Sequence, residues 1–175
     1  MKELIVSLPL EKANVIVEEA LKVGRENNMF PLTVSVLDSG GHLLSFQRED
    51  GSGILRGDIA SGKAWGALGM GISSRTIRDR GKDRLAFQNA IATASKGRLI
   101  PVPGGVLICN LDGQVLGSIG ISGDTSERDE YCAIKAIKSA GLVPDPEEED
   151  PNENMNFPET NSSWLKFEYF SNMFL

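Results

Sequence analysis

The apolar residues between Pro9 and Glu26 recur with the period of an α-helix. Five of them follow one stripe at positions i, i+3, i+4, i+7 and i+8: Ala13, Ile16, Val17, Ala20 and Leu21. This spacing predicts an amphipathic helix. Gly24 or the pair Asn27-Asn28 is predicted to end it.

Two later regions have the pattern of β-hairpins. Apolar and polar residues alternate nearly every second position from Pro31, and Asp38-Ser39-Gly40-Gly41 supplies the residues that a tight turn needs before a second strand from His42 to Arg48. Val106–Cys109 and Val115–Ile121 flank Asp112-Gly113 in the same way. The two hairpins predict an antiparallel sheet.

Helical spacing returns between and after the hairpins. It covers Ile54–Leu68, a short piece at Thr76–Arg80, and Arg84–Ala94. A last helix is predicted from Ser126 to Ala140, because Ser126 and Asp129 form a capping-box pattern and Gly141 is a typical stop. Helices and an antiparallel sheet together define an α+β fold class.

The character of the chain changes at Pro144. Residues 144–151 are rich in proline and carboxylates and predict an extended, self-repelling linker, while aromatic residues follow from Phe157 onward. We therefore predict a domain over residues 1–143 and a C-terminal tail over 144–175. The tail either packs back on its own domain or a neighbouring subunit, which we favour, or docks onto another protein.

Composition restricts the partners. The 175 residues suit one domain, and a net charge of −6 without a dense Lys/Arg cluster makes nucleic acid an unexpected partner. No apolar run is long enough for a membrane span, and no signal peptide is recognisable, so a cytoplasmic protein is expected. Cys109 and Cys132 are predicted to be buried fillers rather than a disulfide.

Several segments together resemble one family. They are residues 36–42, 59–64, 97–106 and 117–125, followed by Asp129-Glu130. Their order and spacing are similar to those of the GlcG/HbpS family of haem-degrading domains, over about residues 5–142. The resemblance implies a profilin-like fold, with an antiparallel sheet of about five strands flanked by helices. It also implies a homo-oligomer and a link to haem or corrinoid metabolism.

Five residues are candidates for binding a small-molecule ligand: His42, Lys63, Arg98, Gly104 and Gly105. The resemblance implies that His42 is a haem-iron ligand. The alternative is a polar residue that opens a strand and is held by a backbone hydrogen bond. Lys63 pairs with a ligand carboxylate or simply faces solvent. Arg98 either pairs with a ligand carboxylate or forms a structural salt bridge, and we favour the salt bridge.

Glycines in two loops permit close backbone approach to a ligand. Gly104 and Gly105 follow two prolines that stiffen the loop. Residues 120–125 lead from a strand into a helix N-terminus, where an internally capped helix is favoured over an anion site because acidic residues compete for that end. A lone histidine argues against a zinc site, and no Ser-His-Asp arrangement can be placed.

We therefore expect a small-ligand-binding protein, with haem or another tetrapyrrole as the leading ligand. The alternatives are an enzyme that uses Lys63 and the Gly104-Gly105 loop to hold a small carboxylate metabolite, and an oligomeric scaffold whose tail recruits a partner.

Overall fold

The computed structural model describes residues 2–3, 5–152 and 157 of the chain. Its elements, in chain order, are α1 (Leu10–Glu26), β1 (Thr33–Asp38), β2 (Leu43–Arg48), α2 (Arg56–Met70), α3 (Ser74–Gly81), α4 (Leu85–Ala94), β3 (Gly105–Cys109), β4 (Val115–Ser122), α5 (Ser126–Ser139) and β5 (Val143–Asp145). The strands form one five-stranded antiparallel sheet in the order β2-β1-β4-β3-β5. The α+β class and the predicted sheet are confirmed.

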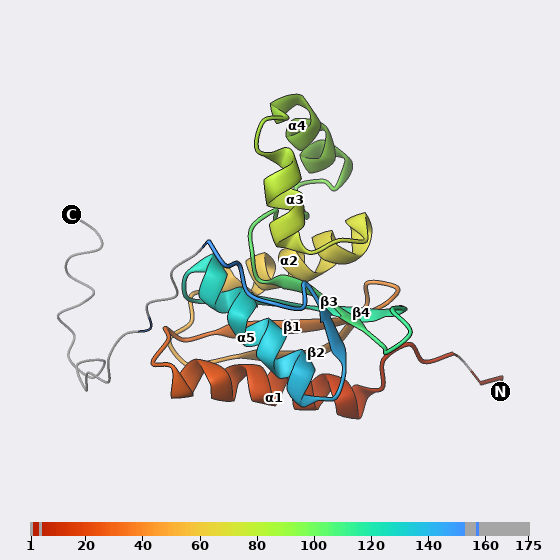
Figure 1. Ribbon diagram of the computed structural model, residues 1–175, viewed down its shortest axis with the longest axis vertical. Helices are drawn as coiled ribbons and strands as arrows, with labels where there is room; N and C mark the ends of the chain where they lie inside the picture. The colour runs from red at the N-terminus through yellow and green to blue at the C-terminus, as the bar shows by residue number, and fades with distance from the viewer. Residues whose placement is uncertain (1, 4, 153–156, 158–175) are drawn as a thin grey trace.

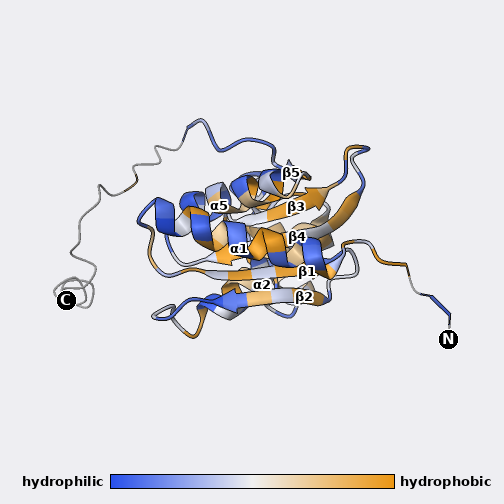
Figure 2. Ribbon diagram, turned by 90° about the horizontal axis from the view of Figure 1, so that it is seen from below, coloured by the Kyte–Doolittle hydropathy of each residue, from blue (hydrophilic) through white to orange (hydrophobic). Residues whose placement is uncertain are grey.

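Helices cover both faces of the sheet (Figure 1). α1 and α5 pack together on one face, where the main hydrophobic core lies. α1 contacts β1 and β2, α5 contacts β3, β4 and β5, and Figure 2 shows both helices in front of the sheet. Four residues of the stripe predicted for α1 are buried, Ala13, Ile16, Val17 and Ala20, and the fifth, Leu21, is half-buried. No helix among the described residues is both long and apolar enough to cross a membrane.

The opposite face of the sheet lies against α2 and is lined by small residues. A Cβ added at Gly120 would overlap the carbonyl oxygen of Ala60, and the Ser118 hydroxyl donates to the carbonyl of Ala64 over 2.9 Å. On the other side of α2, a Cβ at Gly62 would lie 2.6 Å from the carbonyl oxygen of Arg98. α2 is therefore held between the sheet and the segment that follows α4.

α3 and α4 stand away from the rest of the molecule (Figure 1). We call these two helices the arm. α4 has no buried residue, and Leu85 is 72 % exposed. The base of the arm is fixed by Ser74, whose hydroxyl accepts from the Gly105 amide at 2.7 Å, and by the buried side chain of Ile77.

The segment after α5 differs from the predicted linker. Val143–Asp145 forms β5 and pairs with β3, so the sheet continues beyond residue 143. Glu148 and Glu149 then form ion pairs with Lys138 and Lys135 of α5, at 2.7 and 3.0 Å. The prediction of a self-repelling linker was wrong here, because cations on α5 neutralise the carboxylates. The division into a domain and a tail stays a prediction, and residues 158–175 lie outside the described residues.

The beginning of α5 is capped internally, but one residue earlier than predicted. Thr125, rather than Ser126, is the N-cap, and its side chain accepts from the Arg128 amide. Asp129 reaches back to accept from the Asp124 amide at 3.1 Å. Both cysteines are free and buried, as predicted.

Candidate ligand-binding site

The five predicted ligand-binding residues occupy two different environments. Lys63, Gly104 and Gly105 lie together in the interior, where α2, β3 and α5 meet. His42 and Arg98 lie on the surface, and Arg98 contacts the ring of Trp65. The two groups differ in solvent access and therefore in what they can bind.

Lys63 is neither solvent-facing nor free to hold a ligand in this structure. Its side chain is 2 % exposed, and its ammonium donates to Asp129 Oδ2 and to the carbonyl of Ile121, each at 2.9 Å. Burial raises the pKa of Asp129 to about 6, although the ion pair with Lys63 opposes this shift. The pair links α2 to α5, which lie on opposite faces of the sheet.

Gly104 and Gly105 make this arrangement possible. Gly104 has a φ of +112°, and a Cβ there would lie 2.9 Å from the Lys63 ammonium. A Cβ at Gly105 would lie 2.7 Å from the carbonyl carbon of Lys63. The glycines therefore serve close packing of the loop on Lys63, which the sequence pattern alone does not distinguish from close approach to a ligand.

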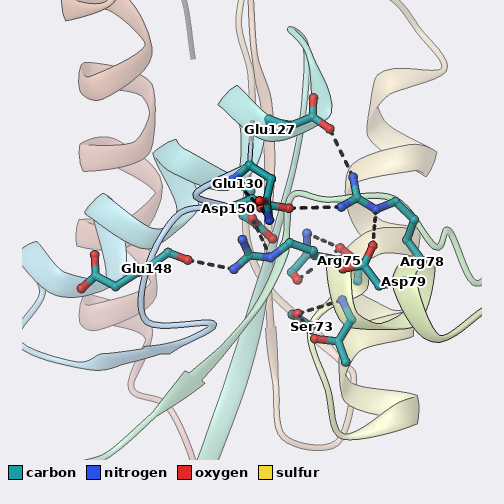
Figure 3. Close-up of polar contacts among 12 residues, drawn as sticks. Ser73, Arg75, Arg78, Asp79, Glu127, Glu130, Glu148 and Asp150 are labelled. Atoms are coloured by element: carbon teal, nitrogen blue, oxygen red, sulfur yellow. Dashed lines mark hydrogen bonds and ion pairs between the residues drawn. The ribbon is translucent and has the colours of Figure 1, made fainter. Parts of the chain in front are cut away.

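A second ion pair begins at the neighbouring residue of α5 (Figure 3). Arg75 of α3 lies 3.3 Å from Glu130 Oε2 and donates to the carbonyl of Glu148 at 2.8 Å. Arg78, one turn further along α3, bridges Glu127 and Asp150, each at 3.4 Å. These contacts join the arm, α5 and the segment after β5.

His42 lies at the end of the turn between β1 and β2. Its side chain is 81 % exposed, and its Nδ1 lies 3.2 Å from both oxygens of Asp38. Asp38 also accepts from the amides of Gly40 and His42 at 2.9 Å. Burial alone would raise the pKa of Asp38, but hydrogen bonds from His42 and Gly40 outweigh it and lower that pKa. Nδ1 faces Asp38, and among the described residues Nε2 of His42 has no hydrogen-bond partner.

Trp65 of α2 lies close to the turn that carries His42 and contacts Arg98. A Cβ at Gly41, next to His42, would lie 3.4 Å from Trp65 Cδ1. The Arg98 guanidinium lies 4.7 Å from the centroid of the Trp65 ring, a cation–π contact. Arg98 thus contacts an aromatic ring, and no carboxylate within the described part of the chain lies at ion-pair distance, contrary to the favoured salt-bridge alternative.

The same surface continues along β2. Leu43 and Phe46 pair with Leu37 and Ser35 of β1, and directly opposite residues of antiparallel strands share a face. Because Ser35 receives a hydrogen bond from Ser61 of α2, this is the α2 face. Leu43 is 59 % exposed and Phe46 is 42 % exposed. We call the region that comprises the turn with His42 and, on the α2 side, Leu43, Phe46, Trp65 and Arg98 the His42 face.

Sequence reasoning missed three members of this face and one partner in the interior. Leu43 and Phe46 lie in the predicted second strand but are three residues apart, so simple alternation places them on opposite faces. The bulge in the pairing of β1 with β2 brings them to the same face. The spacing of apolar residues placed Trp65 in a predicted helix and indicated no role in binding. Asp129 was assigned to the helix end, and its contact with Lys63, 66 residues away, had no local signal.

The fold and this exposed face define a small α+β domain with a candidate surface site for a partly apolar ligand. Residues 8–138 match the family of haem-degrading proteins described as HbpS-like. The chain therefore belongs to this family.

Relatives and solved structures agree with this assignment. An uncharacterised 15.0 kDa protein of Citrobacter freundii is 31% identical over 107 residues, covering 61% of this chain and 74% of that protein. Protein GlcG of Escherichia coli K12 is 29% identical over 118 residues, covering 67% and 82%.

Similar folds come from three solved structures. The PduOC–haem complex has a TM-score of 0.69 at 23% identity, covering 77% of this chain and 96% of that one. Klebsiella pneumoniae ORFY has a TM-score of 0.69 at 27% identity, covering 80% and 94%. A variant of Streptomyces reticuli HbpS has a TM-score of 0.66 at 22% identity, covering 79% and 90%.

Proposed function

We propose that the chain binds haem or a closely related metallotetrapyrrole on the His42 face. The observation that carries the proposal is the orientation of His42, whose ring is exposed and whose Nδ1 is directed at Asp38. Metal-bound histidines commonly donate their second nitrogen to a carboxylate in this way, which fixes the ring and increases its basicity. His42 Nε2 is therefore suited to be an axial ligand of haem iron.

The rest of the face suits the other parts of the ligand. Haem presents a large apolar ring, and on the His42 face Leu43 and Phe46 are exposed and Trp65 is half-buried. Haem also carries carboxylates, and the exposed Arg98 guanidinium is a suitable partner for one of them. The family assignment and the PduOC–haem complex among similar folds add support.

The interior group of candidates gives less support to the alternative of an enzyme that holds a small carboxylate. Lys63 is already paired with Asp129 and almost fully buried. A substrate would have to displace Asp129 and leave that carboxylate without its partner. Since breaking a buried pair is costly, the exposed Arg98 is the better anion partner.

The test is a titration of the purified chain with haem, followed by the Soret absorbance, beside His42→Ala. We expect saturable binding with the spectrum of a histidine-ligated iron, and a large loss of that signal in the variant. Added imidazole should restore the spectrum in His42→Ala, because the free base can occupy the vacated position. The matched control is Lys22→Ala on α1, an exposed residue away from this face.

A second titration examines the carboxylates of the ligand. Arg98→Ala should weaken haem binding by several-fold and leave binding of the dimethyl ester of haem unchanged, because an exposed ion pair contributes about 0.2–1 kcal/mol. Absence of a Soret change in the wild-type chain, or an unchanged spectrum in His42→Ala, would contradict the proposal.

A further inference from the structure

α4 is an apolar helix that stands at the outer end of the arm (Figure 1). Seven of its ten residues are apolar, and none of the ten is buried. Leu85 is 72 % exposed and Phe87 is 36 % exposed. A helix that is apolar around most of its circumference is normally covered on all sides. The composition of α4 therefore indicates that a further apolar segment packs on it.

The arm also carries an excess of positive charge, although the whole chain has a net charge of −6. From the beginning of α3 to the end of α4 there are five cations and two carboxylates. Three of the cations, Arg80, Lys82 and Arg84, are exposed, and no ion pair joins them to another described residue. The arm therefore suits a segment that combines apolar side chains with carboxylates.

The C-terminal segment of the same chain, residues 158–175, has this composition. It contains five aromatic residues and three other large apolar residues. It also contains two carboxylates, Glu159 and Glu168, and a single lysine. Because aromatic side chains gain free energy from burial, this segment is suited to an exposed apolar surface.

The chain approaches this segment close to the base of the arm. Arg78 of α3 pairs with Glu127 of α5 and with Asp150, each at 3.4 Å (Figure 3). Phe157 packs on Tyr131 of α5, with ring centroids 5.1 Å apart. Glu127 and Tyr131 are four residues apart, which is about 6 Å along a helix. The α5 residue that contacts Phe157 is therefore about one helical turn from the α5 residue that contacts the arm.

Length and chemistry both allow the segment to reach α4. The chain from Phe157 to Trp164 spans up to about 25 Å when extended, whereas α3 is only about 12 Å long. The guanidinium of Arg128 lies 5.6 Å from the centroid of the Phe157 ring. The arm offers the same kind of partner, because the guanidinium of Arg84 lies 4.7 Å from the centroid of the Phe87 ring.

We propose that residues 158–175 pack on α4 of the same chain, with their aromatic side chains on the exposed apolar surface that includes Leu85 and Phe87. The two carboxylates of the segment are attracted by the three exposed cations of the arm. The contacts of Asp150 and Phe157 favour the same chain over a second copy, because a short connection gives a high effective concentration. The segment thereby supplies the cover that the composition of α4 requires.

Photo-cross-linking in the full chain locates the segment. With p-benzoylphenylalanine in place of Phe167, irradiation should form cross-links mainly to residues 85–94. Mixing unlabelled chains with nitrogen-15-labelled chains before irradiation identifies, by mass spectrometry, whether each cross-link lies within one chain. Cross-links from Phe167 to α4 within one chain support the proposal. Cross-links between two chains, cross-links to another surface, or an absence of cross-links would overturn it.

Amide hydrogen exchange in the full chain gives an independent measurement. In the double variant Trp164→Ser/Phe167→Ser, the amides of residues 85–94 should exchange about tenfold faster than in the wild type, relative to those of α1. The matched control Leu111→Ser removes a side chain that is 89 % exposed at the turn between β3 and β4, and should leave this exchange unchanged. Unchanged exchange of α4 in the double variant, or an equal increase in the control, would also overturn the proposal.

Discussion

The interior group around Lys63 and the exposed His42 face both contain predicted ligand-binding residues. The interior group stabilises the fold, whereas the His42 face is accessible to a ligand. In the interior, a lysine and an aspartate satisfy each other with less than one-twentieth of either side chain exposed. On the His42 face, a histidine, an aromatic ring and an arginine remain open to solvent. A charged residue near a glycine loop therefore indicates a binding site only when its side chain stays exposed to solvent.

Replacing Lys63 should lower the stability of the domain more than any of the other substitutions below. Lys63→Met leaves Asp129 buried without its counter-ion and should lower the free energy of unfolding by about 3–5 kcal/mol. Urea unfolding followed by circular dichroism measures this. The double variant Lys63→Met/Asp129→Asn should recover part of the loss, because no unpaired charge remains. A single variant as stable as the wild type would show that the pair does not hold the fold.

Filling the space at Gly105 tests the interior in a second way. Gly105→Ala places a methyl group against the carbonyl of Lys63 and should destabilise the domain by about 1–3 kcal/mol. Gly53→Ala is the control, because a Cβ there meets only Arg56 Cγ at 3.9 Å and should change stability by less than about 0.5 kcal/mol. Equal thermal unfolding of the two variants would argue against the close packing described here.

A smaller effect is expected on the His42 face. Arg98→Ala removes the contact with the Trp65 ring and should lower stability by about 0.5–1 kcal/mol. Arg98→Lys should keep part of it. Denaturant unfolding should show stability decreasing from the wild type to Arg98→Lys to Arg98→Ala. If Arg98→Ala lost as much stability as Lys63→Met, the His42 face would not differ from the interior group in its contribution to the fold.

The smallest change in stability belongs to His42→Ala. The ring is exposed, so its loss should alter the free energy of unfolding by less than about 0.5 kcal/mol while removing the haem spectrum. Thermal unfolding and haem titration of one preparation separate these effects. A strongly destabilised variant would mean that His42 supports the turn rather than a ligand.

Local patterns predicted most of the fold. The two hairpins follow from turn residues at Asp38–Gly41 and Asp112-Gly113, and the helices follow from apolar spacing. β5 was missed because it is a three-residue strand with a central proline in an acidic segment, and its pairing with β3 is a long-range contact. α5 starts at Ser126 as predicted, but its N-cap is Thr125, because Thr125 and Ser126 are both good caps.

The candidate site was less predictable, because its residues meet only in three dimensions. His42 and Arg98 are 56 residues apart and are related through Trp65, which contributes an ordinary helical position to the sequence. Lys63 could not be assigned to the interior without knowing that Asp129 faces it. The choice between a structural and a ligand-binding lysine depends on that partner.

The two edges of the sheet differ in their capacity for strand addition. β5 offers three residues, with Pro144 at the centre, and proline has no amide hydrogen to donate to a further strand. β2 is six residues long and contains no proline, and within the described part of the chain no strand pairs with its outer edge. Aggregation or templated assembly through backbone pairing would therefore proceed from β2. Charged substitutions at its exposed positions are the direct way to make the chain more resistant to both.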